Sequence, residues 1–308
     1  MFDTICKAAG YVEFPNLFGG FRLSVDKTAF TLFGIQVQWY GVIIGLGVLL
    51  CMGLALRACK RYGIESNDLM DYFLFSFPAA IIGARAYYVI FNFDLYKDDL
   101  MEIFSYRSGG LAIYGGILAA TLTVYCVSKV KKRYTFLQMI DFAVPYIFLG
   151  QAIGRWGNFF NQEAYGGPTD LPWGMTGSGI SGVVHPTFLY ESLWCFIGFT
   201  VILWYRRSRF KKTHGESVCL YMILYGFERS IVEGLRTDSL YIGHTGIRVS
   251  QLLSVVLLII GVVMFVMLRY RYRRNLAVQE DAHDSSSGFE DTLTRLDQKE
   301  MHSTQDGE

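Results

Sequence analysis

The sequence lacks a strong excess of charge of either sign, because its 28 Lys and Arg residues nearly balance its 27 Asp and Glu residues. A net charge of +1 supplies no global field for nucleic acid, so no nucleic-acid partner is expected. The six cysteines include no CxxC pair, and we expect free thiols rather than metal ligands or disulfides. The first thirty residues also lack the charged start, apolar core and cleavage site of a signal peptide, so no removable leader is expected.

Apolar residues are abundant: they make up 52% of the chain, and the mean hydropathy is +0.29. They are gathered into blocks close to the roughly 20 residues that a helix needs to cross a bilayer core about 30 Å thick. Five blocks are uninterrupted, and two contain charged residues. The sequence therefore predicts an all-α, polytopic membrane protein of about seven transmembrane helices, at residues 37–56, 69–91, 110–127, 142–160, 187–205, 217–235 and 249–268.

Lys and Arg residues gather in alternate connecting segments, after the first, third, fifth and seventh predicted spans. The positive-inside rule then places the N-terminus outside and the C-terminus in the cytoplasm, in a multi-pass protein of a bacterial cytoplasmic membrane. We expect residues 1–33 to form an N-terminal interfacial arm and residues 34–270 to form a seven-helix catalytic domain. The polar segment 271–308 is expected to be a disordered cytoplasmic tail.

Polar and ionisable residues within the predicted spans are concentrated toward the outer side of the membrane. A helix advances about 1.5 Å per residue, which places Arg85 roughly 24 Å and Arg229 roughly 18 Å above the inner ends of their spans. Such groups cost several kcal/mol unless they are paired or hydrated. Arg229 and Glu233 alone would suit a simple ion pair. A site in the outer half of the bilayer explains the larger set, which comprises Tyr40, Arg85, Tyr114, Arg155, Asn158, Glu191, Tyr225, Arg229 and Glu233.

Four motifs carry these residues. The densest is GRWGNFFNQEAYGG at residues 154–167, where an Arg, two amides and a carboxylate near a helix end suit a phosphate and a polar head group. The alternative is a helix terminus in the headgroup region with a snorkelling Arg. The other motifs are GGLAIYGG at 109–116, HPTFLYE at 185–191 and YGFERSIVEGLRTD at 225–238.

Together these motifs resemble the prolipoprotein diacylglyceryl transferase family of bacteria. Residues 154–167 are similar to the family signature GRxGNFxNxE, and QWYG at 38–41, GAR at 83–85 and VSQL at 249–252 extend the resemblance in order over about 30–268. The resemblance implies a transferase that moves the diacylglyceryl group of phosphatidylglycerol to the lipobox cysteine thiol of a preprolipoprotein, releasing glycerol 1-phosphate. Its implied partners are these two substrates and membrane lipids, with no metal or diffusible cofactor.

The resemblance also implies roles for individual residues. Arg155 matches the family's phosphatidylglycerol-binding arginine and Arg229 a second essential one, and both are expected to clamp the phosphate. Asn158 and Asn161 are expected to bind the glycerol head, and Glu163, Glu191 and Glu233 are expected to orient the arginines or accept protons. Tyr40 and Tyr225 are expected to line the cavity. Arg85 is expected to contribute to substrate binding, and Arg236 to gate or position the peptide.

The sequence departs from one form of the family pattern at Tyr114, where some members carry a histidine proposed as the base. Three explanations of how the cysteine thiol becomes a thiolate stay open. Tyr114 could accept the proton as a tyrosinate, a carboxylate could accept it, or the arginines alone could stabilise the thiolate. A lipid transporter or flippase is the alternative function, and an inverted repeat would favour it, but the sequence shows none. An intramembrane hydrolase would need a Ser–His pair or a metal cluster, whereas only His185 is suitably placed.

Overall fold

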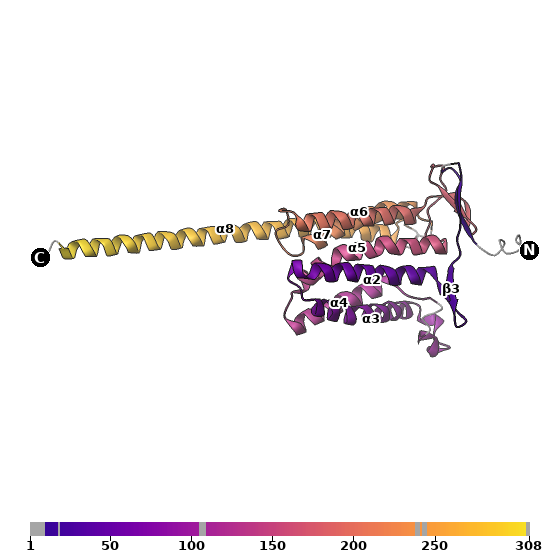
Figure 1. Cartoon of the computed structure of the whole chain (residues 1–308), viewed down its shortest axis with the longest axis horizontal. Coiled ribbons are helices and arrows are strands. Elements are labelled where there is room, and N and C mark those ends of the chain that lie inside the picture. Colours follow the sequence, from indigo (N-terminus) through magenta and orange to yellow (C-terminus); the bar gives the residue numbers. More distant parts are fainter. Residues whose placement is uncertain (1–9, 18, 105–108, 238–240, 242–244, 306–308) are drawn as a thin grey trace, which may run out of the picture.

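The computed structural model describes residues 10–17, 19–104, 109–237, 241 and 245–305. Seven long helices run side by side in one bundle (Figure 1), which confirms the predicted polytopic helical class. They are α2 (Trp39–Cys59), α3 (Ser66–Phe91), α4 (Ile113–Lys131), α5 (Phe136–Asn161), α6 (Thr187–Arg207), α7 (Glu216–Leu235) and α8 (Val249–Gln305). Both ends of the first six helices, and the start of α8, lie within about six residues of the predicted ones, whereas α8 continues far beyond the predicted end at residue 268.

Six of these helices are long and apolar enough to cross a membrane, within the part of the chain that the structure describes. The prediction named seven spans, and α7 is the exception by composition. It carries Glu216, Glu228, Arg229 and Glu233 within 20 residues. All but Arg229 are buried, because α7 lies against α5, α6 and α8 rather than facing lipid on all sides.

The bundle is built from helix pairs, and small residues allow the tightest contact. At the α3–α4 crossing, a Cβ added to Gly115 would lie 2.3 Å from the carbonyl oxygen of Gly83, so only glycine permits this backbone approach. α2 packs on α5, α5 packs on α6, and α7 packs on α8. Short 3-10 helices occupy the connections: η1 (Lys60–Tyr62), η2 (Phe93–Leu95) and η3 (Leu100–Phe104).

Two small antiparallel sheets lie at the end of the bundle predicted to be extracytoplasmic, and the sequence analysis predicted neither. The larger has the order β2-β1-β5-β6, and the smaller is the hairpin β3-β4. β1 pairs with β5 across more than 160 residues, which ties the N-terminal arm to the α5–α6 connection. The strands are β1 (Tyr11–Phe14), β2 (Phe21–Ser24), β3 (Thr28–Leu32), β4 (Ile35–Gln38), β5 (Met175–Gly177) and β6 (Ile180–Val184).

The four-stranded sheet covers the outer ends of α5 and α6 through a buried apolar cluster. Val12 and Met175 from the sheet pack with Phe159 of α5 and Phe188 of α6. This packing fixes the outer ends of the two helices that carry the 154–167 and 185–191 motifs. The boundary predicted at residue 33 falls in the turn of the β3-β4 hairpin, and the division into domains stays a prediction.

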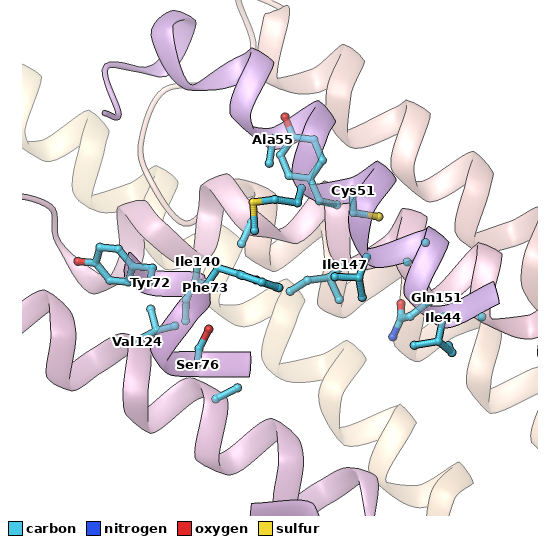
Figure 2. A pocket seen from close by; sticks show the side chains of 18 of the residues that line it. Ile44, Cys51, Ala55, Tyr72, Phe73, Ser76, Val124, Ile140, Ile147 and Gln151 are labelled. Atoms are coloured by element: carbon cyan, nitrogen blue, oxygen red, sulfur yellow. The ribbon is translucent and has the colours of Figure 1, made fainter. Parts of the chain in front are cut away.

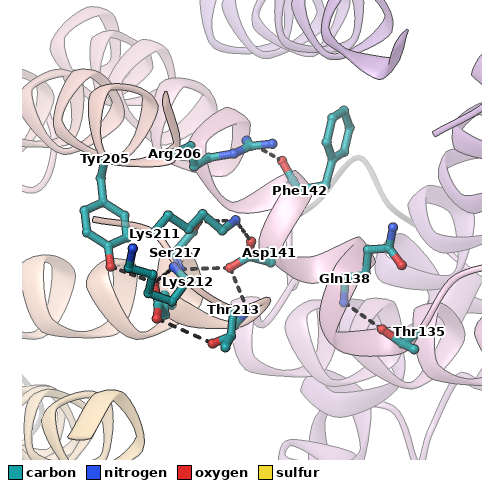
Figure 3. A network of polar contacts seen from close by, with 12 residues as sticks. Thr135, Gln138, Asp141, Phe142, Tyr205, Arg206, Lys211, Lys212, Thr213 and Ser217 are labelled. Atoms are coloured by element: carbon teal, nitrogen blue, oxygen red, sulfur yellow. Dashed lines mark hydrogen bonds and ion pairs between the residues drawn. The ribbon is translucent and has the colours of Figure 1, made fainter. Parts of the chain in front are cut away.

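At the opposite end of the bundle a buried polar network joins α5, α6 and α7 (Figure 3). The carboxylate of Asp141 pairs with Lys211 and accepts hydrogen bonds from the backbone N–H groups of Gly215 at 2.9 Å and Ser217 at 2.8 Å. Arg206 donates to the carbonyl oxygen of Phe142 at 3.1 Å. These contacts fix the ends of three helices on the side predicted to be cytoplasmic.

Helix α8 leaves the bundle and continues as a single rod to residue 305 (Figure 1). It passes through the segment 271–308 for which the sequence predicts disorder, and that expectation stays a prediction. The five cysteines within the described residues are free thiols, as expected, and Cys6 lies outside them.

Candidate functional site

A single carboxylate, Glu191 of α6, lies at the centre of a group of three arginines. Its Oε2 atom is 2.5 Å from Nη2 of Arg155 and 3.2 Å from Nη1 of Arg229, and its Oε1 atom is 3.8 Å from Nη1 of Arg236. Glu191 is only 1% exposed, so these contacts form with little competition from solvent. The structure therefore brings together residues from α5, α6 and the end of α7 that the sequence analysis assigned to one site.

Local packing explains why α6 holds its carboxylate at this position. The helix begins at Thr187, directly after Pro186, which places Glu191 about one turn inside it. The Ser192 hydroxyl donates to the carbonyl oxygen of Ala152 at 2.8 Å and accepts from the Trp156 indole at 3.2 Å. α5 and α6 are thus held in register beside Arg155.

Helix α7 presents Tyr225, Arg229 and Glu233 on one face, as the i, i+4, i+8 spacing predicted. Nη2 of Arg229 lies 2.6 Å from Oε2 of Glu233, so this guanidinium bridges two carboxylates. Gly226, three residues before Arg229, packs on α8, where an added Cβ would lie 2.6 Å from the carbonyl oxygen of Ser254. Arg229 itself is held by its ion pairs with Glu191 and Glu233.

A cavity of about 640 Å³ begins beside this group and runs between α2, α3, α4 and α5 (Figure 2). Its outer end is lined by Arg155, Asn158, Tyr40 and Tyr225, and the substrate-binding roles expected for these residues stay predictions. Tyr40 packs on Gly157, where an added Cβ would lie 2.5 Å from the tyrosine ring. Anionic and apolar parts of one ligand can therefore be bound side by side.

The end of α5 forms a second polar group at the mouth of the cavity. Oε1 of Glu163 accepts hydrogen bonds from the side-chain amides of Asn158 at 3.0 Å and Asn161 at 3.1 Å. Gln162 and Ala164 adopt left-handed backbone conformations with φ of 52° and 57°, which turn the chain sharply after the helix. Glu163 is exposed and binds the two asparagines, whereas the sequence analysis placed it with the arginines.

Two predicted site residues belong neither to the arginine group nor to the residues that line the cavity. Tyr114 is 45% exposed at the start of α4. Arg85 is 3% exposed, and its guanidinium donates to the carbonyl oxygens of Glu102, Ile103, Gly109 and Gly110 at 2.7–3.1 Å. Arg85 thus holds η3 and the segment just before α4 against α3, and these contacts stabilise the α3–α4 connection.

Two residues near the site were not singled out from the sequence. Gln151 lies one turn below Arg155, lines the cavity and donates to the Tyr221 hydroxyl at 2.9 Å. Glu228 is 4% exposed, its charge interacts with Glu191, Arg155 and Arg229, and neither carboxylate oxygen has a hydrogen-bond partner among the described residues. Gln151 could have been predicted from the sequence because it lies four residues before Arg155 and so on the same face of α5. Glu228 could have been predicted because it is an ionisable residue next to Arg229 within a predicted span.

Comparison with known proteins identifies the family. The family model described as prolipoprotein diacylglyceryl transferase matches residues 27–267. The chain belongs to this family. Curated relatives named phosphatidylglycerol–prolipoprotein diacylglyceryl transferase include one from Finegoldia magna, 50% identical over 257 residues, which are 83% of this chain and 100% of the relative. Relatives from Clostridioides difficile and Clostridium kluyveri are 42% and 46% identical, covering 82% and 81% of this chain and 99% of each relative.

The matched region of this diacylglyceryl transferase family member includes the arginine group, the cavity and all seven helices up to residue 267 of α8. It begins in the N-terminal arm just before the β3-β4 hairpin, so β1 and β2 lie outside it. Membership of a bacterial membrane-enzyme family agrees with the six apolar helices, and the chain is a multi-pass protein of the cytoplasmic membrane.

Proposed function

We propose that this protein transfers the diacylglyceryl group of phosphatidylglycerol to the lipobox cysteine of preprolipoproteins, with release of glycerol 1-phosphate. The observation that carries the proposal is the pairing of Arg155 and Arg229 with the same oxygen of Glu191 at the polar end of an apolar cavity. The family names of the relatives support the same reaction.

The charge of the group suits a lipid phosphate. Three arginines face Glu191 and Glu233, which leaves one positive charge among these five side chains. A phosphodiester carries one negative charge, and guanidinium groups bind such oxygens through charge-assisted hydrogen bonds. Arg155 has five N–H donors, of which its contact with Glu191 uses one terminal nitrogen. Because Arg155 lines the cavity, its other donors can bind a phosphate that lies there.

The reaction needs one bond to form and one to break. The cysteine sulfur attacks the glycerol carbon, a carbon–sulfur bond forms, and the carbon–oxygen bond to the phosphate breaks with its electron pair passing to the phosphate oxygen. Arg155 and Arg229 stabilise the negative charge that develops on this leaving group. The thiol proton passes to a base and finally to the released phosphate, so protons and charge balance.

Among the carboxylates assigned to the site, the contacts favour Glu163 as the proton acceptor. Glu191 and Glu233 each hold an arginine and so are committed to orienting the clamp. Glu163 instead binds neutral amides at the cavity mouth and is exposed to an arriving peptide. Asn158 and Asn161 would exchange this contact for the glycerol hydroxyls when lipid binds.

The test is an assay with purified protein, phosphatidylglycerol carrying a radiolabelled head-group glycerol, and a lipobox peptide. Release of water-soluble labelled glycerol phosphate together with a lipidated peptide is expected, and a peptide with Ser in place of Cys should give neither. Arg155→Ala and Arg229→Ala should each lower the rate by about 10²–10³-fold, the usual cost of removing a group that stabilises transition-state charge. Arg57→Ala, an exposed arginine at the far end of α2, is the matched control.

Movement of intact lipid between leaflets without release of glycerol phosphate would instead support the transporter alternative. Full activity of both Arg155→Ala and Arg229→Ala would show that the arginine group does not bind the reacting phosphate.

A further inference from the structure

The cavity is a long channel rather than a compact pocket. On α2 it is lined at Tyr40, Ile44, Gly47, Cys51 and Ala55, a continuous stripe of one helical face. On α5 its lining runs from Asn158 at the outer end to Met139 near the inner end. Figure 2 shows Ile44 and Gln151 at one end of the cavity and Tyr72 and Val124 toward the other.

Its length exceeds the thickness of one leaflet. Arg155 and Met139 are sixteen residues apart on α5, which corresponds to about 24 Å along the helix. Half of a 30 Å hydrocarbon core is about 15 Å. A lipid whose phosphate lies at Arg155 can therefore keep an acyl chain inside the protein along its whole length.

The inner end of the channel is closed by packed side chains with charges behind them. Phe142, Tyr72 and Leu69 are 2%, 3% and 7% exposed, and all three line the cavity. The Tyr72 hydroxyl is held by Ser128 at 3.0 Å. Asp68 precedes Leu69, and its Oδ1 atom lies 2.7 Å from Nζ of Lys131 at the end of α4. A chain that reached this floor would have to displace an ion pair to go further.

The cavity volume is sufficient for one acyl chain. A water molecule takes about 30 Å³ in the liquid, and a methylene group is of similar size, so 640 Å³ holds on the order of 20 such groups.

We propose that the channel is a binding subsite for one acyl chain of the donor lipid, and that its floor at Leu69, Tyr72 and Phe142 limits the chain length that is accepted. This proposal rests on the proposed function, because the lipid is anchored through its phosphate at Arg155. An acyl chain longer than the distance from Arg155 to this floor would not fit within the channel.

The decisive variant is Val124→Trp, which places a large ring in the channel just above the floor. Rates are measured with phosphatidylglycerols that carry two identical chains, from dilauroyl through dipalmitoyl to distearoyl, in mixed micelles. Val124→Trp should lower kcat/KM for the dipalmitoyl lipid about tenfold or more relative to the dilauroyl lipid, because a few methylene groups in a tight apolar site discriminate by this factor. An equal loss for all lipids would overturn the proposal.

The matched control is Leu122→Trp, two residues away on α4, where the side chain is 63% exposed and outside the cavity. It adds the same ring and should leave the chain-length profile unchanged. Leu69→Ala gives a second test if Val124→Trp does not fold: enlarging the floor should raise the relative rate with the distearoyl lipid. An unchanged profile in Leu69→Ala would also overturn the proposal.

Native mass spectrometry separates this inference from the proposed function. The lipids that remain bound to the purified protein should be shorter in Val124→Trp than in the wild type. If the wild type retains lipid with this length dependence but transfers nothing, the proposed function fails and the subsite stands. If transfer is normal and retention shows no length dependence, the subsite fails alone.

Discussion

Replacement of Glu191 by glutamine is the sharpest perturbation that the structure offers. Glutamine keeps the shape of the side chain but removes the negative charge that faces Arg155, Arg229 and Arg236. At an effective dielectric constant of 20, one contact of 2.5 Å such as that with Arg155 is worth about 7 kcal/mol before desolvation is subtracted. The net loss is smaller, and breaking a buried pair typically costs about 3–5 kcal/mol.

Two measurements follow from this magnitude. Since about 1 kcal/mol shifts the unfolding midpoint by roughly 2–4 °C in a domain of this size, Glu191→Gln should lower the Tm in detergent by about 6–20 °C. Lipid transfer should fall by at least about 10²-fold even where the protein is folded, because the arginines are no longer held in register at the cavity. Circular dichroism and the radiolabel assay report the two effects separately.

Glu65→Gln is the control for this experiment. Glu65 pairs with Arg133 on an exposed surface, where both side chains are at least half exposed and a pair contributes at most about 1 kcal/mol. It should leave both measurements nearly unchanged. If Glu191→Gln kept the wild-type Tm and turnover, Glu191 would not be the element that holds the arginines, and the geometric basis of the site would be lost.

Three further substitutions test other parts of the molecule. Tyr114→Phe should retain measurable turnover, because this half-exposed residue lies outside the arginine group; complete loss in a folded protein would reinstate it as the base. Arg85→Met removes a guanidinium that donates to four carbonyl oxygens, and it should expose the 95–112 connection to limited proteolysis; unchanged cleavage would show that this residue does not hold the connection. Asp141→Ala should destabilise the protein by about 3–5 kcal/mol in thermal unfolding, with little change in the KM for lipid, because its network lies at the other end of the bundle; a raised KM with normal stability would contradict this separation.

Much of the architecture was predictable because bilayer thickness imposes a length on apolar blocks. All seven helices were found, including the charged helix α7, and only the end of α8 lies far from its predicted position. The N-terminal sheet was not found, because β1 pairs with β5 across a long separation and strands of three to five residues carry little periodic signal.

The membership of the site was partly predictable. Helical rise placed Arg155, Glu191 and Arg229 at similar depth, since depth depends only on position along each span. It placed Arg85 there as well, and the structure shows why depth was insufficient: the side chain turns to backbone carbonyls of its own connection.

The amino-acid sequence by itself determined the number of helices, the charge asymmetry that predicts their direction, and the family motifs. Each of these depends only on which residues follow one another in a short stretch of the chain. Only the tertiary structure decided that Glu191 is the common partner of three arginines, that Glu163 accepts hydrogen bonds from two asparagines, and that an apolar channel leads inward from Arg155. Periodicity tells which face of a helix is apolar, but the neighbour that meets this face is fixed by the packing of all the helices together.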